Sequence, residues 1–185
     1  MIDFTSALPD AVTVNGRAFL IKTDFRVWLK FDRGLEESGI ENVRLEDILQ
    51  DPLDVPDMSE IEGFVSGIMD FYINRNPLPK DTGGSGARVL DYYLDGDYIY
   101  AAFLEQYGID LVDIEYLHWY KFQALIRSIS DNTMLGKIMS YRGYKNSGNK
   151  SYEKQMQELK YAWGLPTKYT EEEQEQIDEF NNYFG

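Results

Sequence analysis

The sequence predicts a mainly α-helical protein, a helical bundle with a small β-hairpin near its N-terminus. Apolar residues recur at helical spacing through most of the chain, most clearly over residues 97–129. An Asn-Gly pair at 15–16 separates two β-rich runs, which is the strongest short signal of a hairpin. Proline and glycine gather between the periodic segments, at 52–56 and 77–86, and mark the connections.

The first half of the chain is expected to hold the hairpin and three helical segments. Residues 11–23 form the hairpin, and Thr23 or Asp24 caps the helix that follows. Residues 43–49 suggest a short helix. Ser59 and Glu62 have capping-box spacing and predict a helix over 60–76 that Pro77 ends. The first of these helices should bury a stripe made of Phe25, Trp28, Leu29 and Phe31.

The second half is expected to be helical throughout. A helix over 97–107 should begin at a cap by Asp95 or Asp97 and end at a left-handed Gly108. A long helix over 112–129 should carry His118 within its apolar stripe. The remaining predicted features are a helix over 134–142 capped by Asp131 or Asn132 with Met134, Leu135, Ile138 and Met139 inward, a basic amphipathic helix over 151–163, and an acidic tail helix capped by Thr170.

These elements suggest four parts that together form one compact unit. Residues 1–76 hold the hairpin and its helices, and residues 77–90 form a flexible linker, because Gly and Ser at that density cannot bury a core. Residues 91–168 form the C-terminal helical core, and residues 169–185 form the acidic tail.

Composition excludes several classes of protein. The chain has no cysteine, which rules out disulfides, thiolate catalysis and zinc–cysteine sites. No apolar run reaches the roughly 18 residues of a membrane span, and the N-terminus lacks the pattern of a signal peptide. A net charge of −14 argues against a general nucleic-acid binder. We therefore expect a soluble intracellular protein that binds neither membrane nor nucleic acid.

Charge is unevenly placed along this acidic chain. Residues 121–168 carry nine bases and three acids, between two acidic segments. A basic segment of this kind either forms solvated helix faces or binds an acidic partner. The candidate partner contacts that it offers are Lys137, Arg142, Lys150, Lys154 and Lys160.

The candidate chemistry is weak. His118 is the only histidine, and an apolar helix position favours a histidine satisfied between helices over a catalytic one. Asp91, Asp95 and Asp97 resemble a calcium loop only in part, since two ligand positions, including the bidentate glutamate, are missing. The glycines at 83–86 lack the Gly-Lys-Ser/Thr ending of a phosphate loop. The sequence thus indicates no catalytic, cofactor-binding or metal-binding residues.

Several strings in the chain resemble a family of small bacteriophage proteins, the phage "gene product fifteen" family. Its genes lie in the tail modules of long-tailed phages and prophages of Gram-positive bacteria. The opening VNGRAFLIKTDFRVWL resembles the family's hairpin and Asp-Phe-Arg helix, and the match is weakest at 77–95 and 170–185. The central strings are Asp97 to Phe103, Tyr107 to Leu111 (YGIDL), Leu117 to Leu125 (LHWYKFQAL) and Met139 to Arg142.

The resemblance implies a non-enzymatic tail assembly chaperone without a cofactor. Such a protein binds the tape-measure protein, with the tail-tube protein as a further partner, in the host cytoplasm, and is absent from the mature virion. Self-association stays open. The alternatives are a structural tail or tail-completion protein of the virion and a small enzyme using His118. The resemblance makes six residues a folding signature, namely Phe103, Tyr107, His118, Trp119, Phe122 and Leu125.

Overall fold

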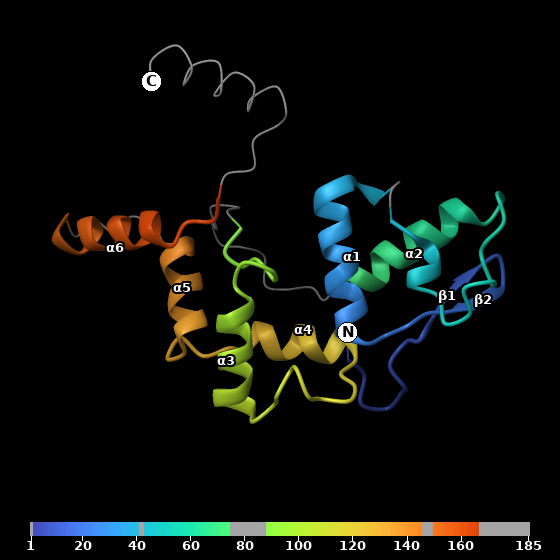
Figure 1. Ribbon diagram of the computed structural model, residues 1–185, viewed down its shortest axis with the longest axis horizontal. Coiled ribbons are helices and arrows are strands. Elements are labelled where there is room, and N and C mark those ends of the chain that lie inside the picture. The colour runs from blue at the N-terminus through green and yellow to red at the C-terminus, as the bar shows by residue number, and fades with distance from the viewer. Residues whose placement is uncertain (1, 41–42, 75–87, 146–149, 167–185) are drawn as a thin grey trace, which may run out of the picture. The chain divides into compact units, whose positions relative to one another are not determined.

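The computed structural model describes residues 2–40, 43–74, 88–145 and 150–166 and confirms the mainly α-helical class (Figure 1). Most of the predicted linker and all of the predicted tail helix lie outside these residues. The elements in chain order are strands β1 (Ala11–Val14) and β2 (Arg17–Leu20), helix α1 (Phe25–Ser38), the 3₁₀ helix η2 (Leu45–Asp47), and helices α2 (Ile61–Ile73), α3 (Gly96–Tyr107), α4 (Trp119–Arg127), α5 (Met134–Gly143) and α6 (Lys150–Ala162).

The chain forms two compact units, and the boundary between them falls within α5. Met1–Gly84 and Leu90–Lys137 make the first unit, and Ser85–Val89 and Ile138–Gly185 make the second. This grouping differs from the expected division, because residues 91–137 join the N-terminal part and not the residues that follow them.

The hairpin forms as predicted around Asn15 and Gly16, whose φ angles of 50° and 84° are those of a tight hairpin turn. Its buried face carries Val12 and Val14, and β1 packs on α2. Two glycines of α2 permit this approach. A Cβ on Gly63 would lie 2.7 Å from Val14 Cγ1, and a Cβ on Gly67 would clash with Val12 Cγ1.

Two tryptophans anchor the core of the first unit. Trp28 of α1 packs on Phe71 of α2 with ring centroids 4.6 Å apart, and its Nε1 donates to Lys22 O at 2.9 Å. Trp119 of α4 donates from Nε1 to Tyr72 O, also at 2.9 Å. Both indoles are fully buried and fully hydrogen-bonded, so the core gains their area without leaving a polar atom unsatisfied.

The helix starts differ from several predicted caps. The Ser59–Glu62 capping box is wrong: Asp57 N instead donates to the Glu60 carboxylate at 3.2 Å, while Asp57 Oδ1 accepts from Ser59 N. The predicted helix over 43–49 is reduced to η2, because Leu49 turns to pair with Ile21 in an isolated β-bridge. In both places a hydrogen bond to another nearby group replaces the one that the local sequence pattern predicted.

Helix α3 ends at Gly108, which has the predicted left-handed conformation with φ 64°. Asp95 occupies its N-cap position, but the Asp95 carboxylate points backward and accepts from Asp91 N at 2.9 Å. The Asp91 carboxylate in turn accepts from Tyr93 N and Leu94 N. These acids therefore order the turn that leads into α3.

Helix α5 is capped by Thr133, not by Asp131 or Asn132 as predicted, since Thr133 Oγ1 accepts from Gly136 N at 3.0 Å. The tight approach of Gly136 to Ser130 O brings the preceding loop across the first turn. Leu135 and Ile138 are fully buried as expected, but Met134 is 40% exposed. The stripe therefore starts one residue later than predicted.

Candidate functional site

The candidate site lies at the N-terminal ends of α1 and α4. Phe25 N donates to Leu117 O at 2.9 Å, and Trp119 N donates to Thr23 O at 2.7 Å. These two bonds pair Asp24 with His118 in an isolated antiparallel bridge. Both residues are the N-caps of their helices, so a single backbone pairing sets the starting point of both.

The predicted helix over 112–129 is wrong in its first half, because this bridge requires extended backbone at 117–118. His118 has ψ 138° and stands outside the helix, which begins at Trp119. Upstream, the Asp110 carboxylate accepts from Val112 N at 2.9 Å and Asp113 N at 3.2 Å and closes a turn. Leu117 is buried like the apolar residues of α4, but it precedes the helix and is separated from it by the extended backbone at 117–118.

Asp24 joins the two helix starts through its carboxylate as well. Its Oδ1 caps α1 by accepting from Arg26 N at 3.0 Å, and its Oδ2 accepts from Leu117 N at 3.1 Å. Arg26 pairs with this carboxylate and donates from Nη2 to Ile114 O at 2.6 Å and Leu111 O at 3.1 Å. The guanidinium thereby holds the 111–114 segment against the start of α1.

His118 is buried, and both ring nitrogens have backbone partners. Nδ1 accepts from Tyr120 N at 3.0 Å, so Nε2 carries the proton and donates to Pro9 O at 3.1 Å. Burial lowers the pKa of His118, Lys121 adds to this effect, and the Pro9 contact opposes it. His118 is therefore an uncharged N-cap of α4, whereas the sequence predicted a hydrogen-bonded histidine packed between two helices.

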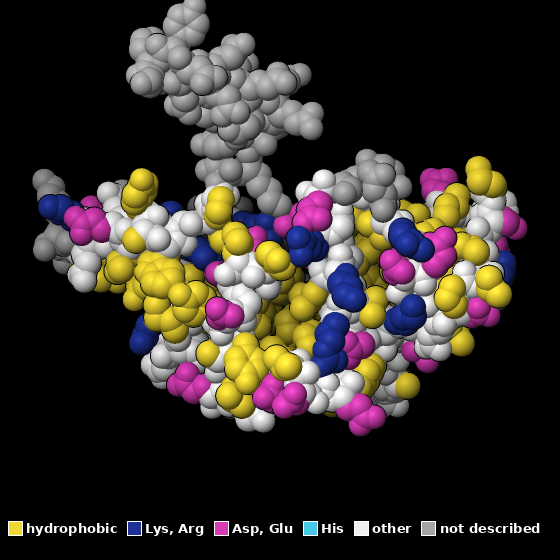
Figure 2. All heavy atoms as spheres, in the orientation of Figure 1, with side chains coloured by type: hydrophobic (Ala, Val, Ile, Leu, Met, Phe, Trp, Pro, Cys, Tyr) yellow, Lys and Arg dark blue, Asp and Glu magenta, His cyan; other side chains and the backbone are white. Residues whose placement is uncertain are grey.

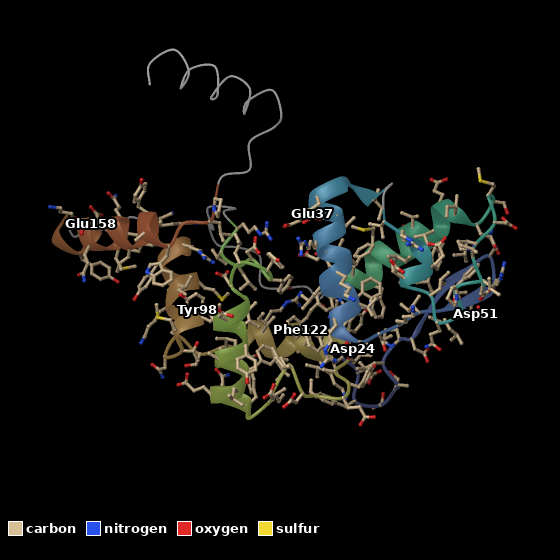
Figure 3. The ribbon with its side chains drawn as sticks, viewed as in Figure 1. Asp24, Glu37, Asp51, Tyr98, Phe122 and Glu158 are labelled. Carbon is tan, nitrogen blue, oxygen red and sulfur yellow. The ribbon has the colours of Figure 1, made fainter. Side chains whose placement is uncertain are left out.

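Aromatic rings fill the space behind the bridge. Phe122 stacks on Phe25 at 4.8 Å, on Phe103 at 5.3 Å and on Trp119 at 5.7 Å between ring centroids. Figure 3 labels Asp24 and Phe122 at this junction of α1 and α4. The six signature residues thus meet in one region of the first unit, and Tyr107 joins Leu125 through a hydrogen bond from its hydroxyl to the Leu125 carbonyl at 2.7 Å.

Phe25 and Phe122 also line an open apolar cavity of about 390 Å³ between α1, α3 and the 111–112 segment. Figure 2 shows hydrophobic side chains lining a hollow between α1 and α3. We call this the aromatic groove, and Asp97 is the one charged residue among the described residues that line it. Its lining residues are Phe25, Leu29, Tyr92, Gly96, Asp97, Ile99, Tyr100, Leu111, Val112 and Phe122.

The groove contains residues that sequence reasoning did not single out as a site. Leu29 was expected in the core but is half-buried on the groove wall. Val112 is 75% exposed at the same place, although an exposed valine beside Leu111 carries no sequence signal of its own. Chemically, the groove offers aliphatic and aromatic contacts, which suit insertion of apolar side chains and do not suit acid–base catalysis.

The five basic residues proposed as partner contacts differ in burial. Lys137 and Lys154 are exposed, whereas Arg142 is buried and donates from Nε to Trp163 O at 2.6 Å and from Nη1 to Val89 O at 3.1 Å. Lys160 donates to Tyr144 O at 2.9 Å. The side chain of Lys150 lies outside the described residues. Of these five candidates, Lys137 and Lys154 are therefore the ones that the described residues show exposed at the surface.

No group of three or more His, Asp or Glu side chains is arranged to hold a metal ion within the described ranges. In the same part of the chain, no helix has the length and apolar character needed to cross a membrane.

A family model described as Bacteriophage Gp15 protein matches residues 4–165. The chain belongs to this family. As a Gp15 protein it is a phage structural or assembly protein. Comparison with curated proteins and with solved structures found no match in either set.

Three of the strings that resemble the Gp15 family come together at the junction of α1 and α4. The strings Asp24-Phe25-Arg26, Tyr107 to Leu111 and Leu117 to Leu125 lie far apart in sequence, and all fall within the matched range. In the structure they meet around the Asp24–His118 bridge, where they also build one wall of the aromatic groove.

Proposed function

We propose that this Gp15 protein is a non-enzymatic tail assembly chaperone of a long-tailed phage or prophage, and that it binds the tape-measure protein during tail morphogenesis. The aromatic groove is the observation that carries this proposal. It is an open apolar surface lined mostly by residues of the strings that resemble the family, and it lacks an arrangement for catalysis.

A tape-measure protein is long and helical, and an amphipathic helix presents apolar side chains at i, i+3, i+4 and i+7. The aromatic groove offers the complement of such a stripe, because its described lining consists of rings and aliphatic side chains with Asp97 as the one charge. Its wall is rigid: Phe25 and Phe122 are buried, stacked and fixed by the helix starts beside them. A preformed apolar wall binds a helical client without paying a large ordering cost.

The acidic character of the chain supports the same role. A net charge of −14 keeps a protein with an open apolar groove apart from its own copies and soluble at high concentration. We place its action in the host cytoplasm, before the virion matures, and include the tail-tube protein among its partners.

The test uses size-exclusion chromatography of the full chain mixed with a fragment of the tape-measure protein encoded beside it. The wild-type chain should bring the fragment into a soluble complex. Val112→Glu, which places a charge in the groove, should weaken that complex by about tenfold or more. Leu53→Glu is the matched control, because Leu53 is 89% exposed and does not line the groove. A fragment whose solubility and elution the wild-type chain leaves unchanged would refute the proposal.

Mass spectrometry of purified phage separates this function from a structural role. A chaperone should be absent from the virion. Detection at a fixed stoichiometry beside the tail proteins would instead identify a tail or tail-completion component.

A further inference from the structure

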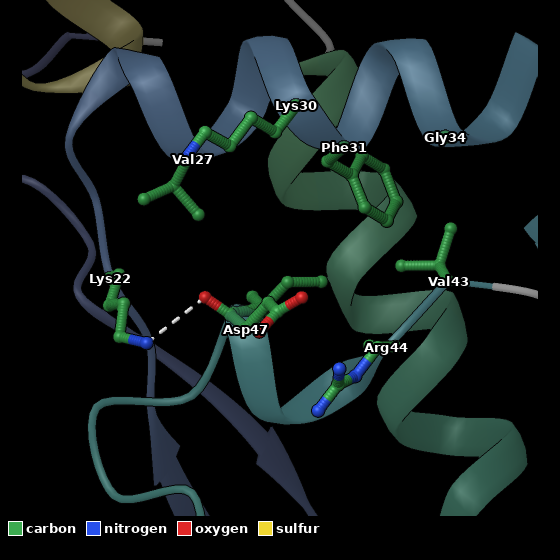
Figure 4. Close-up of a pocket in the computed structure, with 9 residues that line it drawn as sticks. Lys22, Val27, Lys30, Phe31, Gly34, Val43, Arg44 and Asp47 are labelled. Atoms are coloured by element: carbon green, nitrogen blue, oxygen red, sulfur yellow. Dashed lines mark hydrogen bonds between the residues drawn. The ribbon is translucent and has the colours of Figure 1, made fainter.

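A second hollow of the first unit lies between α1 and the 43–48 segment that contains η2, and it has a volume of about 510 Å³. Its floor is apolar: Phe31 and Ile48 are buried, and Val27 and Val43 are half-buried beside them. Figure 4 shows Val27, Phe31 and Val43 pointing into the space between the two segments. The volume is within the range of sites that hold a ligand or a few side chains.

The rim of this hollow is cationic. Among the described residues, Lys22, Lys30 and Arg44 line it, against the single acid Asp47. Lys22 Nζ donates to Asp47 O at 3.1 Å and to Glu46 O at 3.5 Å, so backbone carbonyls hold this ammonium in place at the wall (Figure 4). Lys30 and Arg44 are exposed, and neither has a carboxylate partner among the described residues. We call this hollow, with its three cations and apolar floor, the basic cleft.

The surroundings make this concentration of positive charge unusual. Residues 1–120 carry 23 acids and nine bases. In that stretch, the other described arginines of the first unit are neutralised: Arg17 pairs with Asp54 and Glu60, Arg26 with Asp24, and Arg33 with Glu37. Among the described residues of the first unit within 1–120, the cations that have no carboxylate partner are therefore those of the basic cleft.

We propose that the basic cleft binds an acidic amphipathic peptide segment of a partner protein. Apolar side chains of the segment insert between Phe31 and Val43, and its carboxylates pair with Lys30 and Arg44. The charge complements an acidic peptide, and the apolar floor requires a ligand with an apolar group, which a free anion lacks. An extended nucleic acid fits poorly, since its phosphate backbone offers no aliphatic side chain for the apolar floor. This site shares no residue with the aromatic groove and does not depend on the function proposed for that groove.

Fluorescence anisotropy of the full chain with a labelled helical peptide of glutamate and leucine tests the proposal. The wild type should bind this peptide, and binding should weaken as salt rises. Replacing the peptide's leucines by serine, or its glutamates by lysine, should weaken binding by about tenfold or more. Equal affinity for the serine peptide would show a simple anion site and overturn the proposal.

Charge reversal locates the site. The double variant Lys30→Glu/Arg44→Glu should bind the peptide about tenfold or more weakly, because two attractive charges become repulsive. Lys121→Glu, at an exposed lysine of α4, is the matched control and should stay within about twofold of the wild type. Circular dichroism melts should be alike for all three proteins, since the altered side chains are exposed. A double variant that binds as tightly as the wild type would place the peptide elsewhere and overturn the proposal. The variants leave the aromatic groove intact, so their result is independent of the tape-measure experiment.

Discussion

Asp24 and His118, the N-caps of α1 and α4, are paired directly with each other in a one-residue antiparallel bridge. Each therefore ends a stretch of extended backbone, caps a helix and helps to fix the other helix. This relationship couples the first helix of the chain to the helix that carries Trp119 and Phe122, and the predictions about stability start from it.

Asp24→Ala should lower the free energy of unfolding by about 2–3 kcal/mol, because the cap of α1, the partner of Leu117 N and the ion pair to Arg26 are lost together. Urea denaturation measures the change. Asp131→Ala is the control, since Asp131 is exposed, and its effect should stay within about 0.5 kcal/mol. An equal effect of the two substitutions would contradict the role given to Asp24.

His118 should make the fold less stable as the pH falls below about 6.5. Burial lowers the pKa of the native histidine, so the unfolded chain binds the proton first and gains stability on acidification. This contribution is fully present above the unfolded pKa and is lost below it, at no more than about 1.4 kcal/mol per pH unit.

His118→Asn removes that titration and keeps a side chain that can cap α4. Stability curves of the wild type and the variant, measured from pH 7.5 to 5, should converge as the pH falls. Parallel curves would show that His118 does not contribute to the pH dependence.

Gly67→Ala should destabilise the protein by about 1–3 kcal/mol, because the added methyl group meets Val12 of the hairpin. Gly96→Ala is the contrasting change, since no atom beyond its chain neighbours and its own helix backbone lies within 4 Å of the position that its Cβ would take. That variant should be unchanged or more stable by up to about 1 kcal/mol. Thermal melts of both variants would decide whether the hairpin rests on α2 as closely as described.

Arg142→Lys should loosen α6 within the second unit, because one ammonium cannot reproduce the two bonds from Nε and Nη1 to Trp163 O and Val89 O. Hydrogen exchange of the α6 amides should become about tenfold faster or more. Lys154→Ala, at an exposed position of the same helix, should leave the exchange rates unchanged. Equal protection in the Arg142 variant would contradict its anchoring role.

The sequence predicted features that local chemistry determines. Asn15 and Gly16 specify a turn by their own conformational preferences, and Gly108 ends α3 for the same reason. The start of α4 was missed because the backbone at 117–118 is extended by pairing with residues 23–25, a partner that no local pattern reveals. Caps were misplaced where several polar residues compete, as at Ser59 and Asp57.

The candidate site was predictable only in part. The resemblance selected Phe103, Trp119 and Phe122, and the structure buries all three. The aromatic groove, however, exists only because α1, α3, α4 and the 111–112 segment meet there, and each contributes one or a few residues to it. Periodicity within one helix cannot show which residues of different helices and connecting segments will share a surface, so Leu29 and Val112 were not recognised.

The bridge between Asp24 and His118 also bears on the order in which the chain can fold. The bond from Leu117 N to the Asp24 carboxylate spans 93 residues, so it forms late in synthesis, long after the hairpin and α1 have left the ribosome. Closing such a long loop is slow compared with forming local helices. Phe25 therefore stays uncovered until Phe122 has been made, so the unfinished chain exposes apolar surface during synthesis.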